Sequence, residues 1–499
     1  MNYQSTRDSN IKISSAEAIK RGISVEGGLF VPCTIPSVEL SEINDLCQMT
    51  YQQRAGAILG KFLSDYSEDE IMDCCNKAYS QEKFSSSDIA PVYKLNDHTY
   101  MLELWHGPTC AFKDMALQIL PHLLTKALKK TGETNEIVIL VATSGDTGKA
   151  ALEGFKDVEG TKIQVFYPVD GVSEIQKLQM VTQEGNNVSV IAVRGNFDDA
   201  QTGVKKIFTD NEYKNQLAEN GFSFSSANSI NWGRLVPQIV YYFSAYADML
   251  KSGYISLGDK INICVPTGNF GNILAGYYAK LMGLPVNKFI CASNKNNVLT
   301  DFLTDGIYDK NRNFYTTVSP SMDIVISSNL ERLLYLISLD TDYVTDCMNK
   351  LSENGIYKVT DEIKAKITED FYAGFCDDEN TKKEISSIHN EYGYVSDTHT
   401  AVALKVYDEY VKTTDDYTPT VIASTANPFK FNKSVLEALK PGVDFNSYNE
   451  FELLGMLSSV GNIEIPDSLG KLKDKSVKFC DICDKTDMKA AVNAFLRRG

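Results

Sequence analysis

The chain has 499 residues, of which 43% are hydrophobic and 23% are charged, a balance typical of a globular protein with a sizeable core. Its formal net charge of −16 argues against a nucleic-acid partner and against docking on an anionic membrane, because both need clustered cations. At about 150 residues per domain, this length predicts about three domains.

The amino-terminal ten residues, MNYQSTRDSN, are polar and lack the apolar core of a signal peptide. The longest apolar run, IVILVA, is far shorter than the roughly 20 residues that span a bilayer. Eleven cysteines, an odd number spread along the chain, are typical of reduced thiols. We therefore expect a cytoplasmic protein. Cys480 and Cys483 form a CxxC without a second pair, so we expect no metal site.

The first 90 or so residues predict a mostly helical segment, because three stretches combine serine starts with helix-like apolar spacing. These stretches are residues 14–23, 40–63 and 67–79. The polar run SSSD, followed by Pro91, marks the end of this part of the chain.

The stretch HGPTCAFKDMALQIL, residues 106–120, places Lys113 among residues of low polarity. Thr109 is expected to cap a helix formed by AFKDMALQIL, because its hydroxyl can accept from a first-turn amide. Two interpretations of Lys113 are open at this point. It is a first-turn surface lysine, since buried lysines are rare. Alternatively, it is an amine held in a dry pocket to form a Schiff base, where desolvation lowers its pKa.

From residue 136 onward, short apolar strands alternate with amphipathic helices, which predicts parallel sheets covered by helices. The expected strands are residues 136–142, 162–168, 188–193, 260–266, 287–293 and 418–425. Residues 301–320 contain few apolar side chains and are expected to form a long loop.

The first of two glycine loops, ATSGDTGKAA, follows the strand at 136–142. A nucleotide-hydrolysing phosphate loop needs a glycine five residues before Gly-Lys and a hydroxyl directly after it. Thr143 and Ala150 occupy those positions, so nucleotide hydrolysis is not expected. Ser144, Thr147 and the amides of a helix start suit a carboxylate or a phosphate. A plain strand-to-helix turn would explain the glycines but not the hydroxyls.

The second loop, VPTGNFGN, lies between the strand at 260–266 and a helix. Gly268 and Gly271 let the backbone approach an anion closely, and the helix start adds positive partial charge. A lysine in apolar surroundings, one loop for a cofactor phosphate and another for a substrate anion together point to pyridoxal phosphate.

Further motifs extend this pattern along the chain, in the order YQSTRDS, EGGLFVP, HGPTCAFKDMALQ, TSGDTGKAALEGF, NSINWGRLVPQIVYY, VPTGNFGNILAGYYAKLMGLP, SPSMDIVISSNLERLLY, DTHTAVA and STANPFKF. With these motifs the sequence resembles the threonine synthase family of pyridoxal-phosphate enzymes of the tryptophan-synthase β-subunit type. The long form found in fungi and enteric bacteria is the better match. DTHT departs from the DPHT of the family, which should relax that turn without touching the chemistry.

The resemblance implies an α/β protein of the fold type II architecture, with two doubly wound α/β domains and a helical N-terminal domain. We expect residues 1–92 to form the helical domain and 130–224 the small α/β domain with its TSGDTGK loop. Residues 93–129 and 225–499 would form the large cofactor-binding domain with a C-terminal extension.

The resemblance also implies site residues and a reaction. Lys113 would be the Schiff-base lysine of pyridoxal 5′-phosphate, and Thr425 would bond the pyridine nitrogen. The cofactor phosphate would be cradled by Gly268, Asn269, Phe270, Gly271 and Asn272. The implied reaction converts O-phosphohomoserine and water to threonine and phosphate, with Lys113 moving protons at Cα and Cβ.

Substrate-binding residues follow in the same way. The amino-acid part would face Ser144, Asp146 and Thr147. The phosphate end and its surroundings would involve Lys149, Asn231, Arg234, Asn329 and Arg332. From pattern alone, either arginine could equally be a helix-surface residue. His399 is expected to be structural, because a lysine already covers the proton transfers. We expect the substrate phosphate to close the domains by joining Lys149 to Arg234 or Arg332.

Two alternatives to the threonine synthase reaction are open. One is a related pyridoxal-phosphate enzyme acting on another phosphorylated amino acid or amino alcohol. The other is a non-catalytic binding protein, which would be expected to have lost Lys113 or the GNFGN loop, and both are intact. The resemblance implies a monomer with a small-molecule substrate and neither a nucleic-acid nor a membrane partner.

Overall fold

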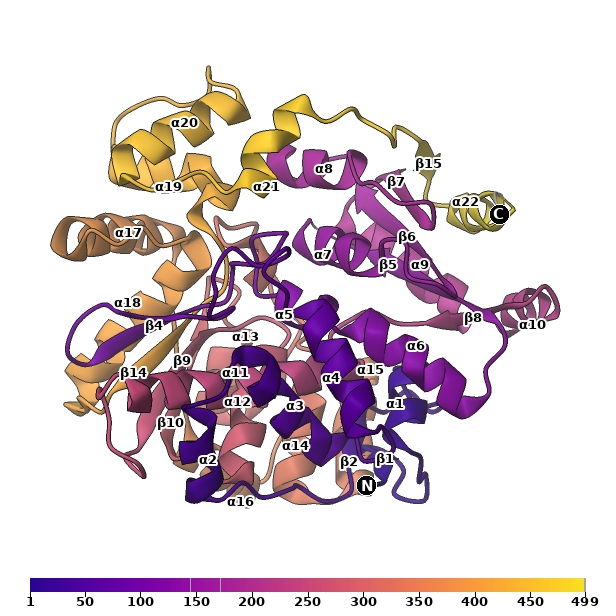
Figure 1. Ribbon diagram of the computed structural model, residues 1–499, viewed down its shortest axis with the longest axis horizontal. Helices are drawn as coiled ribbons and strands as arrows, with labels where there is room; N and C mark the ends of the chain where they lie inside the picture. The colour runs from indigo at the N-terminus through magenta and orange to yellow at the C-terminus, as the bar shows by residue number, and fades with distance from the viewer. Residues whose placement is uncertain (144, 171, 498–499) are drawn as a thin grey trace.

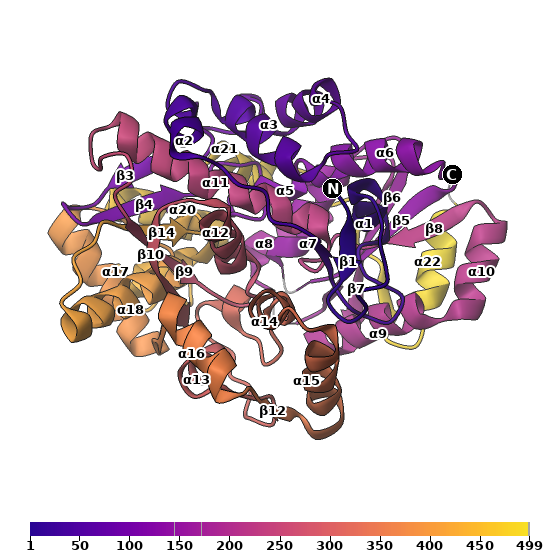
Figure 2. The same ribbon diagram turned by 90° about the horizontal axis from the view of Figure 1, so that it is seen from below.

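The computed structural model describes residues 1–143, 145–170 and 172–497. It contains two mainly parallel sheets that lie in opposite halves of the molecule, with the N-terminal helices packed along one side (Figure 1, Figure 2). Helices cover both faces of each sheet, and this confirms the α/β fold predicted from the alternation of strands and helices.

The larger sheet has six strands in the order β13-β10-β9-β14-β4-β3, and only the edge strand β3 is antiparallel. Its strands are β3 (Val92–Lys94), β4 (Thr99–Glu103), β9 (Ile261–Pro266), β10 (Val286–Ser293), β13 (Phe371–Phe375) and β14 (Thr420–Ser424). The central strands are mainly apolar, because most of their side chains on both faces are buried. Along β9, Ile263 and Val265 face the core formed with α11 (Trp232–Lys251) and α12 (Gly271–Met282). Cys264 faces α18 (Thr398–Thr414) on the other side.

The smaller sheet has five parallel strands in the order β15-β7-β6-β5-β8. They are β5 (Glu136–Ala142), β6 (Thr161–Pro168), β7 (Val188–Arg194), β8 (Phe222–Ser225) and β15 (Ile482–Asp484). The expected division placed residues 225–499 with the large domain, whereas β15 pairs with β7 of this sheet. A three-residue edge strand buries little side chain, so no apolar pattern in the sequence indicates it.

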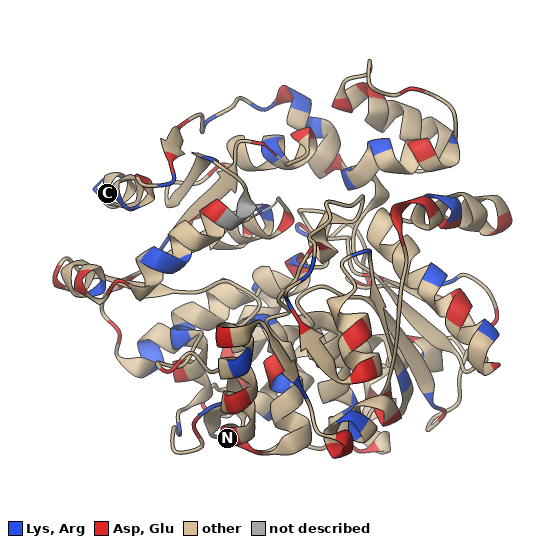
Figure 3. Cartoon of the chain, turned by 180° about the vertical axis from the view of Figure 1, so that it is seen from behind, with Lys and Arg blue, Asp and Glu red and all other residues tan. Residues whose placement is uncertain are grey.

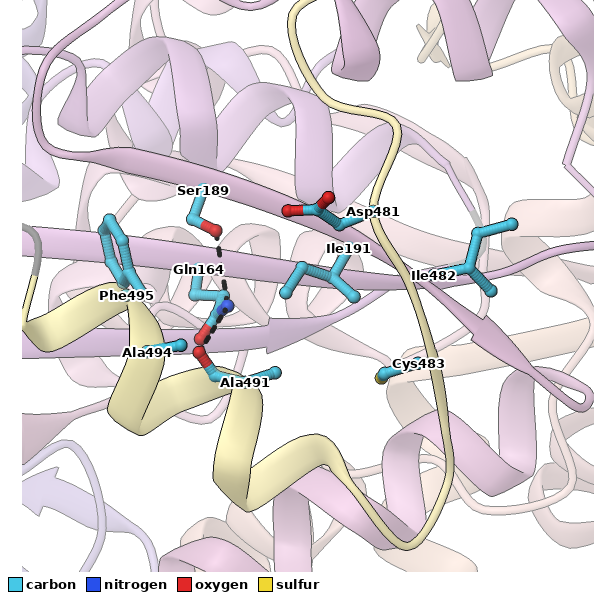
Figure 4. A pocket seen from close by; sticks show the side chains of 9 residues that line it. All are labelled: Gln164, Ser189, Ile191, Asp481, Ile482, Cys483, Ala491, Ala494 and Phe495. Carbon is cyan, nitrogen blue, oxygen red and sulfur yellow. Dashed lines mark hydrogen bonds between the residues drawn. The ribbon is translucent and has the colours of Figure 1, made fainter.

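A cavity of about 160 Å³ lies where the C-terminal helix α22 (Met488–Leu496) covers the smaller sheet (Figure 4). Gln164 is fully buried at its floor, and its Nε2 donates to Ser189 Oγ at 3.2 Å. The same nitrogen lies 3.5 Å from the carbonyl oxygen of Ala491, so this amide connects the sheet to the helix. Helix α22 therefore packs on the smaller sheet, in the half of the molecule opposite the larger sheet.

The N-terminal helices differ in detail from those expected. The stretch 40–63 forms two helices, α2 (Leu40–Leu46) and α3 (Tyr51–Phe62), because Thr50 caps the second one and exchanges hydrogen bonds with Gln53. Helices α1 (Ser15–Arg21) and α4 (Glu68–Ala78) match their predicted stretches. A short antiparallel pair, β1 (Tyr3–Ser5) with β2 (Phe30–Pro32), was not predicted.

The stretch 301–320 is not one long loop. It begins in helix α13 (Val298–Asp305) and continues into β11 (Ile307–Asp309), which pairs with β12 (Ile356–Lys358). Phe302 and Tyr308 are buried there and pack this segment into the core. Because the stretch contains few apolar residues overall, its sequence did not indicate this packing. The helices not yet named are α5 (Asp114–Leu117), α6 (Leu120–Thr131), α7 (Asp146–Phe155), α8 (Glu174–Val181), α9 (Phe197–Thr209), α10 (Asn211–Glu219), η1 (Pro320–Met322), α14 (Leu330–Ser338), α15 (Thr341–Asn354), α16 (Asp361–Asp370), α17 (Asp378–Tyr392), η2 (Pro428–Phe431), α19 (Asn432–Leu439), α20 (Glu450–Gly461), α21 (Asp467–Gly470) and η3 (Lys471–Asp474).

Lys and Arg residues alternate with Asp and Glu along the outer helices in the view of Figure 3. No helix within residues 1–143, 145–170 and 172–497 is both long and apolar enough to cross a bilayer.

Candidate active site

Lys113 lies near the carboxyl end of β14, a central strand of the larger sheet, and is only 9% exposed, so the surface-lysine interpretation is wrong. The segment before it runs beside the end of β14, where Ala111 bridges Ala426 and the Phe112 amide donates to the Thr425 carbonyl at 2.8 Å. The predicted helix over 111–120 is in fact two helices, α5 and α6, and Lys113 sits at the amino end of α5.

Thr109 does not cap that helix as an acceptor; instead it donates hydrogen bonds to a side chain of the helix. Its backbone amide and its hydroxyl both donate to the carboxylate of Asp114, each at 2.8 Å. Burial raises the pKa of Asp114 to about 6 in spite of these bonds. At Gly107 an added Cβ would lie 2.5 Å from Asp114 Oδ2, so only glycine permits this tight loop. Asp114 therefore closes the turn that presents Lys113.

Among the described residues, the amine of Lys113 lies close to the side chains of Ser321 and Asp146. Its Nζ lies 3.3 Å from Ser321 Oγ and 3.6 Å from Asp146 Oδ2. Burial lowers the pKa of Lys113, and the opposing attraction of Asp146 does not cancel this effect. A lysine with a lowered pKa is a nucleophile and a base, which fits the second interpretation made from the sequence.

Asp146, at the amino end of α7, also contacts a second lysine. Lys430 Nζ lies 2.8 Å from Asp146 Oδ1, and Gln176 Nε2 donates to the same oxygen at 2.9 Å. Burial opposes ionisation, but Lys430 and Lys113 hold the pKa of Asp146 below its ordinary value. Sequence reasoning missed Lys430 and Ser321, although both lie in quoted motifs. The position of Lys430 between two phenylalanines could have indicated that this lysine is buried.

The GNFGN loop folds tightly between β9 and α12. At Gly268 an added Cβ would lie 2.8 Å from the carbonyl oxygen of Ser321, so the close approach requires glycine. Phe270 adopts a φ of 60°, which turns the chain into the helix. Asn329 donates from both its backbone amide and its Nδ2 to the Asn269 carbonyl, each at 3.1 Å. Asn329 thus holds the loop in shape.

The side-chain amide of Asn272 has one bonded oxygen and one nitrogen without an acceptor among the described residues. Its Oδ1 accepts from the hydroxyls of Tyr241, at 2.7 Å, and Tyr242. Its Nδ2 is buried and has no hydrogen-bond partner among the described residues. A buried amide without an acceptor costs free energy unless a ligand supplies one. Together with the helix start, this donor fits a phosphate group.

Thr425 is 5% exposed, and its carbonyl accepts from the amide of Phe112, the residue before Lys113. Its backbone amide donates to Thr400 Oγ1 at 3.3 Å, and Thr400 Oγ1 donates to Asp397. Asp397 Oδ1 lies 2.9 Å from His399 Nδ1, so His399 Nε2 is left to accept from the Ser321 amide at 3.1 Å. His399 therefore positions the segment that touches Lys113, consistent with the predicted structural role.

Arg234, on the first turn of α11, is the best-placed anion donor among the predicted substrate residues. One guanidinium nitrogen, Nη1, donates to the Ala227 carbonyl at 2.5 Å. Its Nε is buried and has no hydrogen-bond partner among the described residues. Burial lowers the pKa of Arg234 to about 10, and its charge in turn lowers the pKa of Lys113. Thr147 is half-buried in the first turn of α7, and Ser144 lies outside the described residues.

Other predicted substrate residues have partners inside the protein. Arg332 is fully buried and donates to the carbonyls of Phe30, at 3.1 Å, and Ile230, at 2.6 Å, and to Asn329 Oδ1 at 2.6 Å. It therefore supports the asparagine that shapes the GNFGN loop. A motif with alternating leucines and charges did not show which face of α14 would be buried.

Lys149 and Asn231 likewise differ from their expected roles. Lys149 Nζ lies 2.9 Å from Glu153 Oε2 and donates to Gln183 Oε1, which are both on the smaller-sheet half. Asn231 caps α11 through the Gly233 amide and donates to the carbonyls of Ile19 and Ser226. Lys149 and Arg332 were expected to hold the substrate phosphate from two sides, but both side chains are bound to protein groups. Within the described part of the chain, no group of three His, Cys, Asp or Glu side chains is placed to hold a metal ion.

Two helix-covered sheets with a buried lysine and a glycine loop beside it define the class, which is the fold type II architecture of pyridoxal-phosphate enzymes. The chain belongs to the threonine synthase family. The family models described as "Threonine synthase N terminus" and "Threonine synthase, C-terminal" match residues 2–79 and 400–494. Threonine synthase of Saccharomyces cerevisiae is 34% identical over 99% of this chain and 98% of its own length.

Solved structures agree with the sequence relatives. The pyridoxal-phosphate-bound threonine synthase of Brucella melitensis has a TM-score of 0.88 at 33% identity, covering 100% of this chain and 99% of that chain. The yeast threonine synthase structure has the same TM-score at 34% identity and the same coverage. Human threonine synthase-like 1 is 41% identical over 89% of this chain, which spans only 61% of the human protein's length.

Proposed function

We propose that the chain is a pyridoxal-phosphate-dependent lyase that converts O-phosphohomoserine and water to threonine and phosphate. The observation that carries this proposal is a pair of buried donors without acceptors among the described residues, Asn272 Nδ2 at the end of the GNFGN loop and Arg234 Nε, whose charge acts on Lys113. The reaction needs two phosphate sites, one for the cofactor and one for the substrate. Two such donors match that requirement.

The cofactor would be held at three points. The amides of the GNFGN loop and Asn272 Nδ2 would bind its phosphate, Lys113 would attach it covalently, and Thr425 would face the ring nitrogen. When bound, the cofactor supplies an electron sink for charge that develops at the substrate's Cα. A neutral hydroxyl opposite the ring nitrogen leaves that nitrogen largely unprotonated and restrains side reactions.

The chain's own residues would do the rest of the chemistry. Lys113 Nζ removes the Cα proton and later returns one there, and it moves one proton from Cβ to Cγ. The bond between Cγ and the phosphate oxygen breaks and phosphate leaves. The oxygen of water bonds to Cβ, and the remaining proton of that water goes to the phosphate. Arg234 would hold the departing phosphate, because a guanidinium fork matches phosphate oxygens. Burial of Lys113 and Arg234 excludes bulk water from these steps.

A related phospholyase is the second candidate function. Human and mouse threonine synthase-like 1 proteins are 41% and 40% identical to this chain, a higher identity than the 34% of the yeast threonine synthase. The discriminating assay measures phosphate release from O-phosphohomoserine, O-phosphoserine and phosphoethanolamine, and threonine formation from the first. We expect turnover of O-phosphohomoserine to exceed the others at least about 10²-fold, the discrimination of a well-fitted polar site. Comparable turnover of all three would contradict the threonine synthase reaction.

Asn272→Asp tests the cofactor phosphate site. The new carboxylate would face the phosphate, and a like-charge contact costs several kcal/mol, so we expect the Kd of pyridoxal phosphate to rise about 10²-fold. Equilibrium dialysis of the apo-protein measures this directly. Asn446→Asp makes the same change at an exposed position and serves as the control. Equal cofactor affinity of the two variants would remove Asn272 from the site.

Thr425→Ala and Thr425→Asp test the ring contact. Loss of one hydrogen bond should lower turnover about tenfold while the protein stays folded. The aspartate should protonate the ring nitrogen and favour products of transamination over threonine. Unchanged cofactor affinity and turnover in Thr425→Ala would show that this hydroxyl does not contact the ring.

A further inference from the structure

Lys430 is a buried cation outside the proposed machinery. Its side chain is 0% exposed, and its Nζ lies 2.8 Å from Asp146 Oδ1, 2.8 Å from the Thr109 carbonyl and 3.3 Å from Gln179 Oε1. These acceptors belong to α7, to the loop before Lys113 and to α8. Three acceptors match the three N–H groups of an ammonium ion, so the site is built for a charged lysine.

The carboxylate of Asp146 is shared unequally between two lysines. Its Oδ1 accepts from Lys430 at 2.8 Å, a charge-assisted hydrogen bond. Its Oδ2 lies 3.6 Å from Lys113 Nζ, which is beyond hydrogen-bonding distance, and 3.4 Å from Ser321 Oγ. Lys430 is thus the main counter-ion of Asp146, and Lys113 is a weaker neighbour.

We propose that Lys430 is a positioning residue that neutralises Asp146 and thereby favours the uncharged form of the Lys113 amine for attachment of the cofactor. The inference rests on the proposed function, because it takes Lys113 as the attachment point. Only the neutral amine can act: its nitrogen bonds to the aldehyde carbon of pyridoxal phosphate, and the aldehyde oxygen leaves as water with the two amine protons.

The charges that face Lys113 Nζ support this role. Burial lowers the pKa of Lys113, and Lys430 from η2 and Arg234 from α11 lower it further. Asp146 from α7 acts in the opposite direction. The neighbouring Asp114 is bound by Thr109. Without Lys430, Asp146 would have Lys113 as its nearest cation, and the pKa of Lys113 would rise.

The test measures how fast apo-protein attaches pyridoxal phosphate across a range of pH, followed by the absorbance of the bound cofactor. In Lys430→Met the midpoint of this profile should move up by about one pH unit, which slows attachment about tenfold below the midpoint. Lys430→Arg keeps the charge and should stay near the wild-type midpoint. Lys433→Met is the control, because Lys433 Nζ donates to Asn446 at 2.6 Å, away from Asp146.

A double-mutant cycle keeps the test decisive if Lys430→Met does not fold. Asp146→Asn should lower the midpoint, and adding Lys430→Met to Asp146→Asn should then move it by much less than one pH unit, because the carboxylate through which Lys430 acts on Lys113 is gone. A rise of a full pH unit between these two variants would overturn the proposal, since Lys430 would then act on Lys113 without Asp146. In Lys430→Met, a wild-type midpoint with the borohydride-reduced label still on Lys113 would also overturn it. A label on another lysine in the wild-type protein would instead overturn the proposed function.

Discussion

Lys113→Ala should abolish both covalent attachment of the cofactor and turnover. The wild-type holoprotein should absorb visible light, and borohydride should fix one cofactor on Lys113, as peptide mass analysis would show. Removing a proton-transfer group alone costs about 10²–10⁴-fold in rate, and losing the attachment point adds to this. Lys430, the other lysine that contacts Asp146, is not expected to take over, because its Nζ is bound to Asp146 and the Thr109 carbonyl.

The control for this variant is Lys126→Ala. Lys126 lies on α6 and pairs with Asp73 at 3.0 Å on the outer surface, so its loss should leave labelling and turnover as in the wild type. A reduced adduct at a different lysine in Lys113→Ala would refute the assignment of Lys113.

Arg234→Gln should damage turnover and product choice together. The substrate phosphate would lose its buried donor, so we expect kcat/KM to fall about 10²-fold, or nearly 3 kcal/mol. The unsaturated product left after phosphate loss would be less well shielded, and the share of 2-oxobutanoate relative to threonine should rise. Both products are quantified at saturating O-phosphohomoserine.

The unfolding temperature of the apo-protein is a second, independent measurement on Arg234→Gln. Arg234 carries a buried Nε without a partner among the described residues, so Arg234→Gln should unfold at the same temperature as the wild type or higher. A fall in turnover then reports on function rather than on folding. A variant that raises only KM, with product ratio and kcat unchanged, would show that Arg234 binds phosphate without controlling closure.

Arg332→Gln should behave differently, and this contrast separates the two arginines. Arg332 supports Asn329, which shapes the GNFGN loop, so its loss should weaken cofactor binding before it affects the product ratio. Equilibrium dialysis of both apo-variants with pyridoxal phosphate makes the comparison. Equal cofactor affinities would show that Arg332 does not act through the loop.

Local sequence determined the elements that carry the site. The mainly apolar runs at 136–142 and 260–266 became β5 and β9, because strands buried on both faces do not alternate apolar with polar residues. The glycines of GNFGN allow the loop to approach Ser321, a constraint that residue type alone expresses. Lys113 could be singled out for the same kind of reason, since its neighbours along the chain are apolar.

Tertiary structure decided what each polar side chain meets. Thr109 has the residue type of a helix cap, yet it donates to Asp114 because the helix begins later than its propensity indicates. Arg332 and Arg234 look alike in sequence, but Arg332 donates to two backbone carbonyls and to Asn329, whereas Arg234 Nε has no partner among the described residues. Spacing along a helix fixes the direction of a side chain only relative to that helix, not to its neighbours.

The pairing of Asp146 with Lys430, like that of β15 with β7, joins segments far apart in the chain. A short edge strand is stabilised mainly by backbone hydrogen bonds, and a single lysine by the charges around it. Neither leaves a periodic pattern in the sequence, because the partners come together only when the chain folds. The α/β framework, the lysine and the glycine loop could therefore be predicted from local sequence. The charges that surround the lysine could not, because long-range electrostatic contacts depend on how the folded chain brings distant segments together and not on local composition.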